Sequence, residues 1–186
     1  MAALALGACD SGVDEAVQES AASAGPSYAP RPDSLAGEIS RAFAGTALPA
    51  MTVSDPAGNT LDLGSLDQPV LVNLWATWCA PCVVEMPALD ALAGELDGEV
   101  RVLTISQDSR PELVPPFFEE RNFRHLEQWL DPENDLAVAF TEAGLLPVTI
   151  LFDAEGKELL RVAGGYEWDS EEAVAQLREA LAESAS

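Results

Sequence analysis

The chain has 186 residues, which is enough for one domain with a hydrophobic core and a tail but thin for two domains. Apolar residues make up 48% of the chain and charged residues 22%, a balance typical of globular rather than disordered proteins. Only 9 Lys and Arg stand against 32 Asp and Glu, and the resulting net charge of −23 repels phosphate backbones, which argues against nucleic acid as a partner.

The first nine residues end with the apolar run LALGAC, whose last three residues are small. Residues 6–9 (LGAC) resemble the lipobox of bacterial lipoproteins, in which the cysteine is lipidated and becomes the first mature residue. The resemblance implies that residues 1–9 are part of a lipoprotein signal and that Cys9 carries a lipid. The alternative is an incidental cysteine in a frayed terminus, because no Lys or Arg precedes the apolar run.

The next segments link this terminus to the folded domain. Residues 10–34 are rich in Ala, Ser, Gly, Pro and acidic residues with little periodicity, which predicts a flexible linker. Within residues 35–48 we expect a short helix, because Leu35, Ile39 and Phe43 recur at four-residue spacing. The domain itself is assigned to residues 49–186.

The first half of the domain alternates strand and helix patterns. Residues 51–63 (MTVSDPAGNTLDL) consist of two short alternating runs around a turn, which predicts a β-hairpin. The continuous apolar run PVLVNLWA at 69–76 predicts a central strand covered on both faces. A helical pattern follows from Pro81 to about Leu96, and EVRVLTIS at 99–106 predicts a second buried strand.

The second half begins with an acidic helix opened by prolines at 110–123. Residues 133–144 (ENDLAVAFTEAG) predict another helix, terminated by its final glycine. PVTILFD and KELLRVAG then alternate around a turn as an antiparallel hairpin. The last helix is expected to start at Asp169 or Ser170, because Asp169 and Glu172 have the spacing of a capping box.

Two cysteines, Cys79 and Cys82, lie where the central strand gives way to the first long helix. With Pro81 in the first turn, Cys79 is expected at the helix N-terminus, where free N–H groups and the positive dipole end stabilise a thiolate. Its pKa is therefore expected to be lowered, which makes it a nucleophile. Cys82 lies within bonding reach on the same face, so Cys79 can attack a target disulfide and Cys82 can resolve the mixed disulfide.

The competing interpretations of this pair are a zinc site, a Cu(I) site and an inert bridge. Structural zinc needs four ligands, and the remaining candidates are Cys9 in the linker and His125, the one histidine of the chain. No metal site is predicted, and His125 is interpreted as a surface or packing residue. Cu(I) on the two thiols remains chemically allowed. An inert bridge would stabilise little, because a loop this short constrains the unfolded chain least.

The segment WCAPC at 78–82, preceded by VLVNLWAT, resembles the active site of the thioredoxin superfamily, and the wider VNLWATWCAPCVVEMPAL resembles its TlpA-like, membrane-tethered branch, of TlpA or ResA type. The segments GNTLDLGSL, WLDPENDLAVAF, GLLPVTILFDAEGKEL and GGYEWDS match the same pattern, so the resemblance covers about residues 50–184. It implies an α/β thioredoxin fold, with a central mixed sheet flanked by helices, an N-terminal β-hairpin and a helix-strand insertion near residues 111–130.

The resemblance also assigns roles to individual residues. The nucleophilic cysteine of the family matches Cys79 and the resolving cysteine matches Cys82. Its cis-proline, which faces the redox pair and guides the backbone of the substrate, matches Pro147 after Leu146. The substrate-binding surface is expected to consist of Leu146 and Pro147 together with Trp78, Ala80 and Pro81.

Two further positions separate this chain from thioredoxin itself. Asn73 stands where thioredoxins carry a buried Asp that relays protons, and Asn cannot titrate. The TlpA-like branch instead has a Glu three positions after the second cysteine, which is Glu85 here. Glu85 is expected to modulate the pKa of the thiols or to transfer protons, the alternative being a solvated carboxylate on the helix face. Val148, where the branch usually has Thr, leaves target preference open.

The resemblance implies a periplasmic or otherwise extracytoplasmic thiol-disulfide oxidoreductase, lipid-anchored and monomeric. It favours a reductant of protein disulfides, such as those of apocytochrome c or copper-centre assembly factors, supplied by a membrane thiol-reducing electron donor. No cofactor beyond the Cys79–Cys82 pair is implied. The alternatives are a copper-handling protein that uses the same thiols as Cu(I) ligands and a scaffold with a vestigial pair. Peroxiredoxin chemistry is set aside, because a resolving cysteine in the same turn suits disulfides better than peroxide.

Overall fold

The computed structural model describes Met1, residues 35–141 and residues 144–185. The proposed lipobox cysteine Cys9 and the predicted linker at residues 10–34 therefore lie outside the described residues. Within the described ranges, no helix combines the length and the apolar character that crossing a membrane requires.

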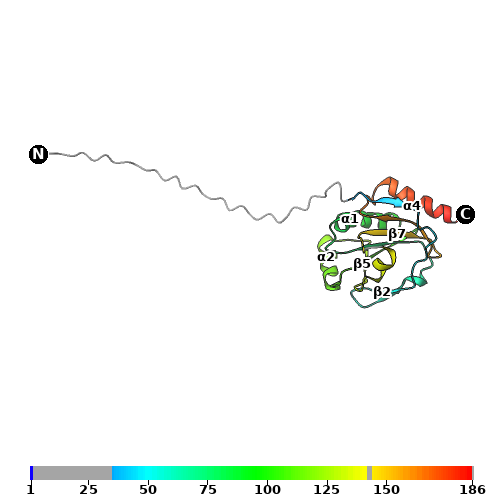
Figure 1. Ribbon diagram of the computed structural model, residues 1–186, viewed down its shortest axis with the longest axis horizontal. Coiled ribbons are helices and arrows are strands. Elements are labelled where there is room, and N and C mark those ends of the chain that lie inside the picture. Colours follow the sequence, from blue (N-terminus) through cyan, green and yellow to red (C-terminus); the bar gives the residue numbers. More distant parts are fainter. Residues whose placement is uncertain (2–34, 142–143, 186) are drawn as a thin grey trace.

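Within the described residues, the centre of the domain is one eight-stranded mixed sheet with the order β1-β8-β7-β4-β5-β6-β2-β3. In Figure 1 this sheet extends from β1, beside α4, to the hairpin that contains β2. The strands are β1 (Glu38–Ser40), β2 (Thr52–Ser54), β3 (Thr60–Asp62), β4 (Val70–Trp75), β5 (Arg101–Ser106), β6 (Glu127–Leu130), β7 (Val148–Phe152) and β8 (Glu158–Ala163). The α-helices are α1 (Ala80–Glu95), α2 (Val114–Arg121), α3 (Asp135–Phe140) and α4 (Glu171–Ser184).

Strand β4 is the centre of the sheet, and all six of its residues are buried. It pairs in parallel with β5 along one edge and antiparallel with β7 along the other, so hydrogen bonds occupy both of its edges. On one face, Leu71 and Trp75 pack with residues of α1, α2 and α4, and on the other, Val72 and Leu74 pack with residues of α3. Alternation places Asn73 on the first face, the face that α1 covers.

The predicted hairpin and insertion are both present. β2 and β3 pair antiparallel around the turn at residues 55–59, where the carboxylate of Asp55 accepts from the backbone N–H groups of Ala57 and Asn59. The insertion consists of α2 and β6, and β6 extends the sheet by pairing in parallel with β5. The predicted α/β thioredoxin fold is confirmed.

The prediction of a short helix within residues 35–48 is wrong, because this segment contains strand β1. β1 pairs antiparallel with β8, and Ile39 packs against the core on the α1 side of the sheet. Gly37 makes the approach possible: a Cβ there would lie 2.7 Å from the Val162 side chain and 2.8 Å from the carbonyl oxygen of Gly164. Pairing with the open edge of β8 therefore determines the conformation of this segment more than the helical spacing of its apolar residues does.

The start of α4 agrees with the sequence prediction, whereas the end of α3 differs from it. α4 starts as predicted, with Ser170 as its N-cap residue, whose Oγ accepts from the backbone N–H of Ala173 at 3.1 Å. The capping box based on Asp169 is wrong, because Ser170 and not Asp169 caps the helix. α3 ends at Phe140, before the predicted terminating Gly144. Side chains bind its last carbonyl groups in place of a glycine cap: Arg161 donates to the Phe140 carbonyl at 2.7 Å, and the hydroxyl of Thr141 donates to that of Ala137 at 2.8 Å.

Candidate active site

Cys79 is the N-cap residue of α1, at the junction between β4 and this helix. Its Sγ atom accepts a hydrogen bond from the backbone N–H of Cys82 at 3.3 Å, and the two cysteines form a disulfide with a Cα–Cα distance of 5.3 Å. The predicted strand-to-helix position is therefore confirmed. In the reduced protein, the free N–H groups and the positive end of α1 favour the thiolate form of Cys79.

The two cysteines differ in access, because Cys79 is 5% exposed and Cys82 is fully buried. Beside them, Trp78 is 68% exposed, Ala80 is also exposed and Pro81 is partly buried. The structure thus places the predicted substrate-contacting residues of this loop at the surface and makes Cys79 the sulfur that a partner can reach first.

The Leu146–Pro147 peptide bond is cis, as the resemblance to the thioredoxin superfamily implies. Pro147 directly precedes β7, and the pairing of Val148 with Leu74 places it beside the end of β4, from which the cysteine loop departs. The backbone N–H of Gly164 donates to the Pro147 carbonyl at 2.9 Å. The topology therefore brings Leu146, Pro147 and the cysteine pair to the same end of the sheet.

The loop between β4 and Cys79 is held by a buried carboxylate from the end of β5. Asp108 accepts from the backbone N–H of Thr77 at 2.9 Å and from its hydroxyl at 2.7 Å. It also accepts from the hydroxyl of Ser106 at 2.8 Å. These charge-assisted bonds fix the chain two residues before Cys79.

Glu85 lies on the buried face of α1, one turn after Cys82, and is only 1% exposed. Its Oε1 accepts from the Nδ2 of Asn73 at 2.9 Å. Its Oε2 accepts from the backbone N–H of Tyr166 at 3.0 Å and from the indole Nε1–H of Trp168 at 3.1 Å. The alternative of a solvated carboxylate on the helix face is therefore excluded.

Burial raises the pKa of Glu85 to about 7, although the hydrogen bonds from Tyr166, Asn73 and Trp168 oppose this by favouring the ionised form. A carboxyl group with a pKa near neutrality exists in both protonation states there, which suits a group that exchanges protons with its neighbours. Glu85 therefore has the ionisation behaviour expected of a general acid or base beside the thiols.

The sequence does not single out three residues of the hydrogen-bond network around Glu85, which are Thr149, Tyr166 and Trp168. Thr149 of β7 accepts from Asn73 Nδ2 at 2.8 Å, so the amide connects Glu85 to a second strand. Tyr166 and Trp168 belong to the segment GGYEWDS, whose match to the family pattern was the one signal that could have identified them. Among the described residues, the Asn73 Oδ1 has no hydrogen-bond partner.

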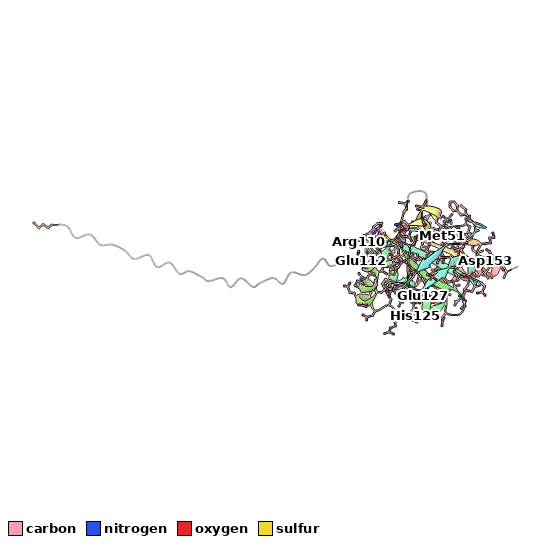
Figure 2. All side chains as sticks on the ribbon, turned by 90° about the horizontal axis from the view of Figure 1, so that it is seen from below. Met51, Arg110, Glu112, His125, Glu127 and Asp153 are labelled. Atoms are coloured by element: carbon pink, nitrogen blue, oxygen red, sulfur yellow. A yellow bond between two sulfur atoms is a disulfide. The ribbon has the colours of Figure 1, made fainter. Side chains whose placement is uncertain are left out.

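His125 is exposed and lies on the same side of the domain as Glu127 (Figure 2). Its imidazole contacts the helix α1 at Gly94. Across the part of the chain that the structure describes, no group of three or more His, Cys, Asp or Glu residues is arranged to hold a metal ion.

Comparisons with known proteins agree with this geometry. The model of the AhpC/TSA family matches residues 44–177. The thiol:disulfide interchange protein HelX of Rhodobacter capsulatus is 35% identical over 94 residues, which are 50% of this chain and 51% of HelX. The chain therefore spans about half the length of this curated relative.

Solved structures share the fold. A DsbE-type protein of Chlorobium tepidum, named as a thiol:disulfide interchange protein, superposes with a TM-score of 0.63 at 22% identity, over 74% of this chain and 97% of that one. The exposed lipoprotein thioredoxin Etrx1 of Streptococcus pneumoniae gives a TM-score of 0.59 at 22% identity, over 69% and 98% of the two chains. With most of its length matched by one family model, and with the fold of these structures, the chain belongs to the AhpC/TSA family of thioredoxin-like proteins.

Proposed function

We propose that this protein is a thiol-disulfide oxidoreductase that reduces disulfides in other proteins. The observation that carries the proposal is the Cys79–Cys82 disulfide at the N-terminus of α1, with a buried Glu85 one turn further along the helix. The name of HelX, a thiol:disulfide interchange protein, supports the same reaction class.

The reaction has two steps, each of which exchanges one sulfur–sulfur bond. In the dithiol form, the Cys79 thiolate attacks one sulfur of the target disulfide; a mixed disulfide forms and the other target sulfur leaves as a thiolate. Cys82 then loses its proton and attacks Cys79, which forms the Cys79–Cys82 disulfide and releases the second target sulfur. Two electrons pass from the cysteine pair to the target, and an external reductant restores the dithiol.

Glu85 serves the second step. Cys82 is fully buried, so its proton has no direct path to bulk water. A carboxyl group with a pKa of about 7 one turn away can accept this proton when Cys82 attacks, and it can return it when the disulfide is reduced.

The proposed site of action is the extracytoplasmic space, with the domain tethered by a lipid on Cys9. The sequence LGAC supports the anchor, and Etrx1, which shares the fold, is named an exposed lipoprotein. Target proteins such as apocytochrome c or copper-centre assembly factors, and a membrane thiol-reducing donor, complete the proposed cycle. The mass of the mature protein tests the anchor: diacylglycerol on Cys9 is expected, and an unmodified N-terminus would contradict it.

Trapping of targets tests the proposed activity. Cys82→Ser should retain Cys79 mixed disulfides that gel shifts and mass spectrometry can identify, because the resolving sulfur is absent. Cys79→Ser is the matched control and should trap nothing, since it lacks the accessible nucleophile. If Cys82→Ser captures no protein and the wild type turns over no disulfide, the proposal fails. Stoichiometric Cu(I) binding without turnover would then favour the copper-handling alternative.

A further inference from the structure

The two oxygens of Glu85 have different environments. Oε2 accepts from two N–H groups that both come from the segment between β8 and α4, the backbone of Tyr166 and the indole of Trp168. Oε1 accepts from one, the Nδ2 of Asn73. A carboxylate oxygen has two lone pairs, so Oε2 is fully occupied. In the part of the chain that the structure describes, the free lone pair of Glu85 is therefore on Oε1.

This asymmetry decides where a proton can bind. A proton on Oε2 would displace one of two N–H donors and leave it buried without an acceptor, which is costly. A proton on Oε1 occupies the free lone pair and leaves the bonds from Asn73, Tyr166 and Trp168 in place. The arrangement of N–H donors therefore favours protonation of Oε1, the oxygen that Asn73 of β4 contacts.

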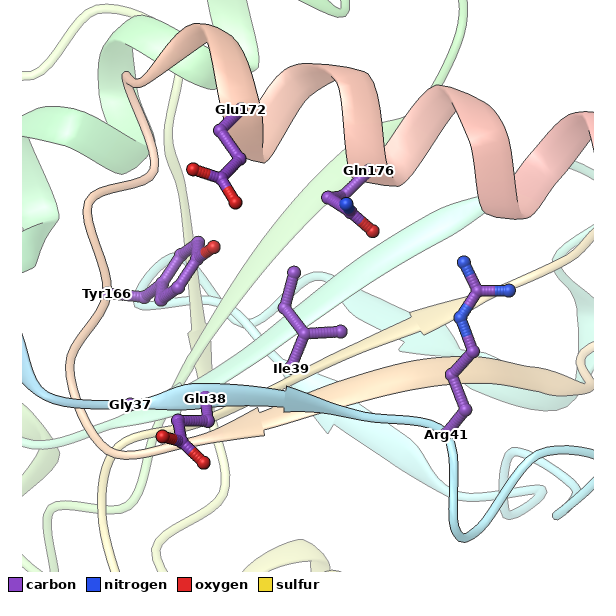
Figure 3. Close-up of a pocket in the computed structure, with 7 residues that line it drawn as sticks. All are labelled: Gly37, Glu38, Ile39, Arg41, Tyr166, Glu172 and Gln176. Carbon is purple, nitrogen blue, oxygen red and sulfur yellow. The ribbon is translucent and has the colours of Figure 1, made fainter.

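Packing in the core fixes the position of the Trp168 side chain, whose indole N–H donates to Glu85. Its side chain is fully buried in the core cluster that also contains Cys82 and Met86. Its ring packs edge-to-face against Tyr166, with 5.0 Å between the centroids. Tyr166 in turn lies between β1 and α4, with Glu172 nearby, and lines a surface pocket of about 430 Å³ (Figure 3).

Resting on the proposed function, we infer that Trp168 is a positioning residue for the proton transfer between Glu85 and Cys82. Its indole N–H, together with the backbone N–H of Tyr166, holds Oε2 and leaves Oε1 as the oxygen that takes up the proton. Because this donor stabilises the ionised carboxylate, Trp168 sets the pH range in which Glu85 can accept a proton.

The elements packed against Glu85 carry other titratable groups. In the oxidised protein two of them, the cysteines, form a disulfide. Asn73 on β4 and Thr149 on β7 do not titrate, and the disulfide-bonded cysteines of α1 do not titrate in that form. The segment after β8 and the first turn of α4 contribute the phenol of one tyrosine, whose pKa is raised chiefly by burial, and four exposed carboxyl groups. The titratable groups on these elements, besides Glu85 itself, are Cys79, Cys82, Asp90, Glu95, Tyr166, Glu167, Asp169, Glu171 and Glu172, and the other titratable groups of α4 lie in its later turns.

The test is a titration of Glu85 in the oxidised protein by carbon NMR of labelled glutamate carboxyls, with the Glu85 signal assigned by its loss in Glu85→Gln. In Trp168→Phe the ring that buries Glu85 is largely retained and the donor is lost. The Glu85 midpoint should rise by about one pH unit. An unchanged or lowered midpoint overturns the inference.

Trp129→Phe is the matched control. Its indole N–H also donates to a glutamate, the Oε2 of Glu127, at 3.0 Å, but on β6. This variant loses the same kind of bond and should leave the Glu85 midpoint unchanged; an equal rise in both variants overturns the specific role of Trp168.

A second measurement covers the case in which Trp168→Phe does not fold. The wild-type chain has four tryptophans, so its indole N–H signals can be assigned individually. The Trp168 signal should shift with pH at the midpoint of the Glu85 carboxyl, whereas a Trp168 signal that ignores this midpoint refutes the bond. The outcome is independent of the proposed function, because failed trapping by Cys82→Ser would leave the titration unaffected.

Discussion

At the scale of single residues, the carboxyl group of Glu85 is subject to two opposing effects. Its three N–H donors favour the ionised form, and its burial favours the neutral form. Burial dominates, which raises the pKa from 4.5 to about 7. A group whose pKa changes on folding also makes the stability of the protein depend on pH.

The free energy of unfolding of the oxidised protein should therefore contain a contribution from Glu85 that falls as the pH rises. Below about pH 4.5, Glu85 is protonated in both states, and between 4.5 and 7 the native state holds a proton that the unfolded state has lost. Because the native state binds more protons in this window, stability declines through it, by on the order of 3 kcal/mol. Urea unfolding from pH 4 to pH 8 measures this decline.

Glu85→Gln isolates the contribution of this one carboxyl from those of the other acidic residues. Glutamine has nearly the same shape and does not titrate, so the difference in unfolding free energy between wild type and variant should change across this pH window. A difference that is constant from pH 4 to pH 8 would show that Glu85 titrates alike in the folded and unfolded states.

The same substitution should slow resolution by Cys82. Glutamine cannot accept a proton, so the second exchange step at neutral pH should fall by about 100-fold, whereas formation of the mixed disulfide by Cys79 should change little. Quenched-flow measurement with a labelled disulfide peptide separates the two steps. Glu95→Gln, on the exposed side of the same helix, is the control; a normal resolution rate in Glu85→Gln would exclude proton transfer by this residue.

At the scale of secondary-structure elements, the geometry of the active-site loop depends on the neighbouring strand. Asp108, just after β5, binds the backbone and hydroxyl of Thr77 and the hydroxyl of Ser106. The parallel pairing of β4 and β5 brings the ends of both strands together, so this carboxylate can fix the loop that leads to Cys79.

Asp108→Ala should lower the free energy of unfolding by about 3 kcal/mol, since it leaves buried donors without their charged acceptor. It should also change the rate at which iodoacetamide alkylates Cys79 in the reduced protein. Asp90→Ala provides the control: the Asp90 carboxylate accepts from the backbone N–H groups of residues 124–126, away from the redox pair. That variant should lose stability without altering alkylation, and equal alkylation rates in both variants would contradict the role of Asp108.

The sequence predicts most elements of this domain because their signals are local. Continuous apolar residues identify β4, and turn residues between alternating runs identify the β2–β3 and β7–β8 hairpins. β1 was missed because its three residues become a strand only against the open edge of β8, which is distant in sequence. For the same reason the local spacing identifies Cys79 and Cys82 but not Trp168 as a donor to Glu85, because Trp168 lies 83 positions further along the chain.

At the scale of the whole molecule, net charge is the property that affects every encounter with a partner or substrate. A net charge of −23 on a 19.7 kDa chain produces a negative potential that extends beyond the surface at low ionic strength. Cationic partners are attracted and anionic ones repelled before any contact with Trp78 or Cys79. Selectivity among disulfides of similar chemistry should therefore include an electrostatic contribution.

Two small disulfides of opposite charge measure this contribution. The reduced protein should react faster with cystamine, a dication, than with the anionic oxidised glutathione, and the ratio of the two rate constants should fall on the order of tenfold as salt rises from low concentration to about 0.5 M. The salt dependence of the ratio is informative because the intrinsic reactivity of the two disulfides differs but is nearly unaffected by screening. A ratio that stays constant with salt would mean that the charge serves solubility alone and that recognition depends on contacts at the surface around Cys79.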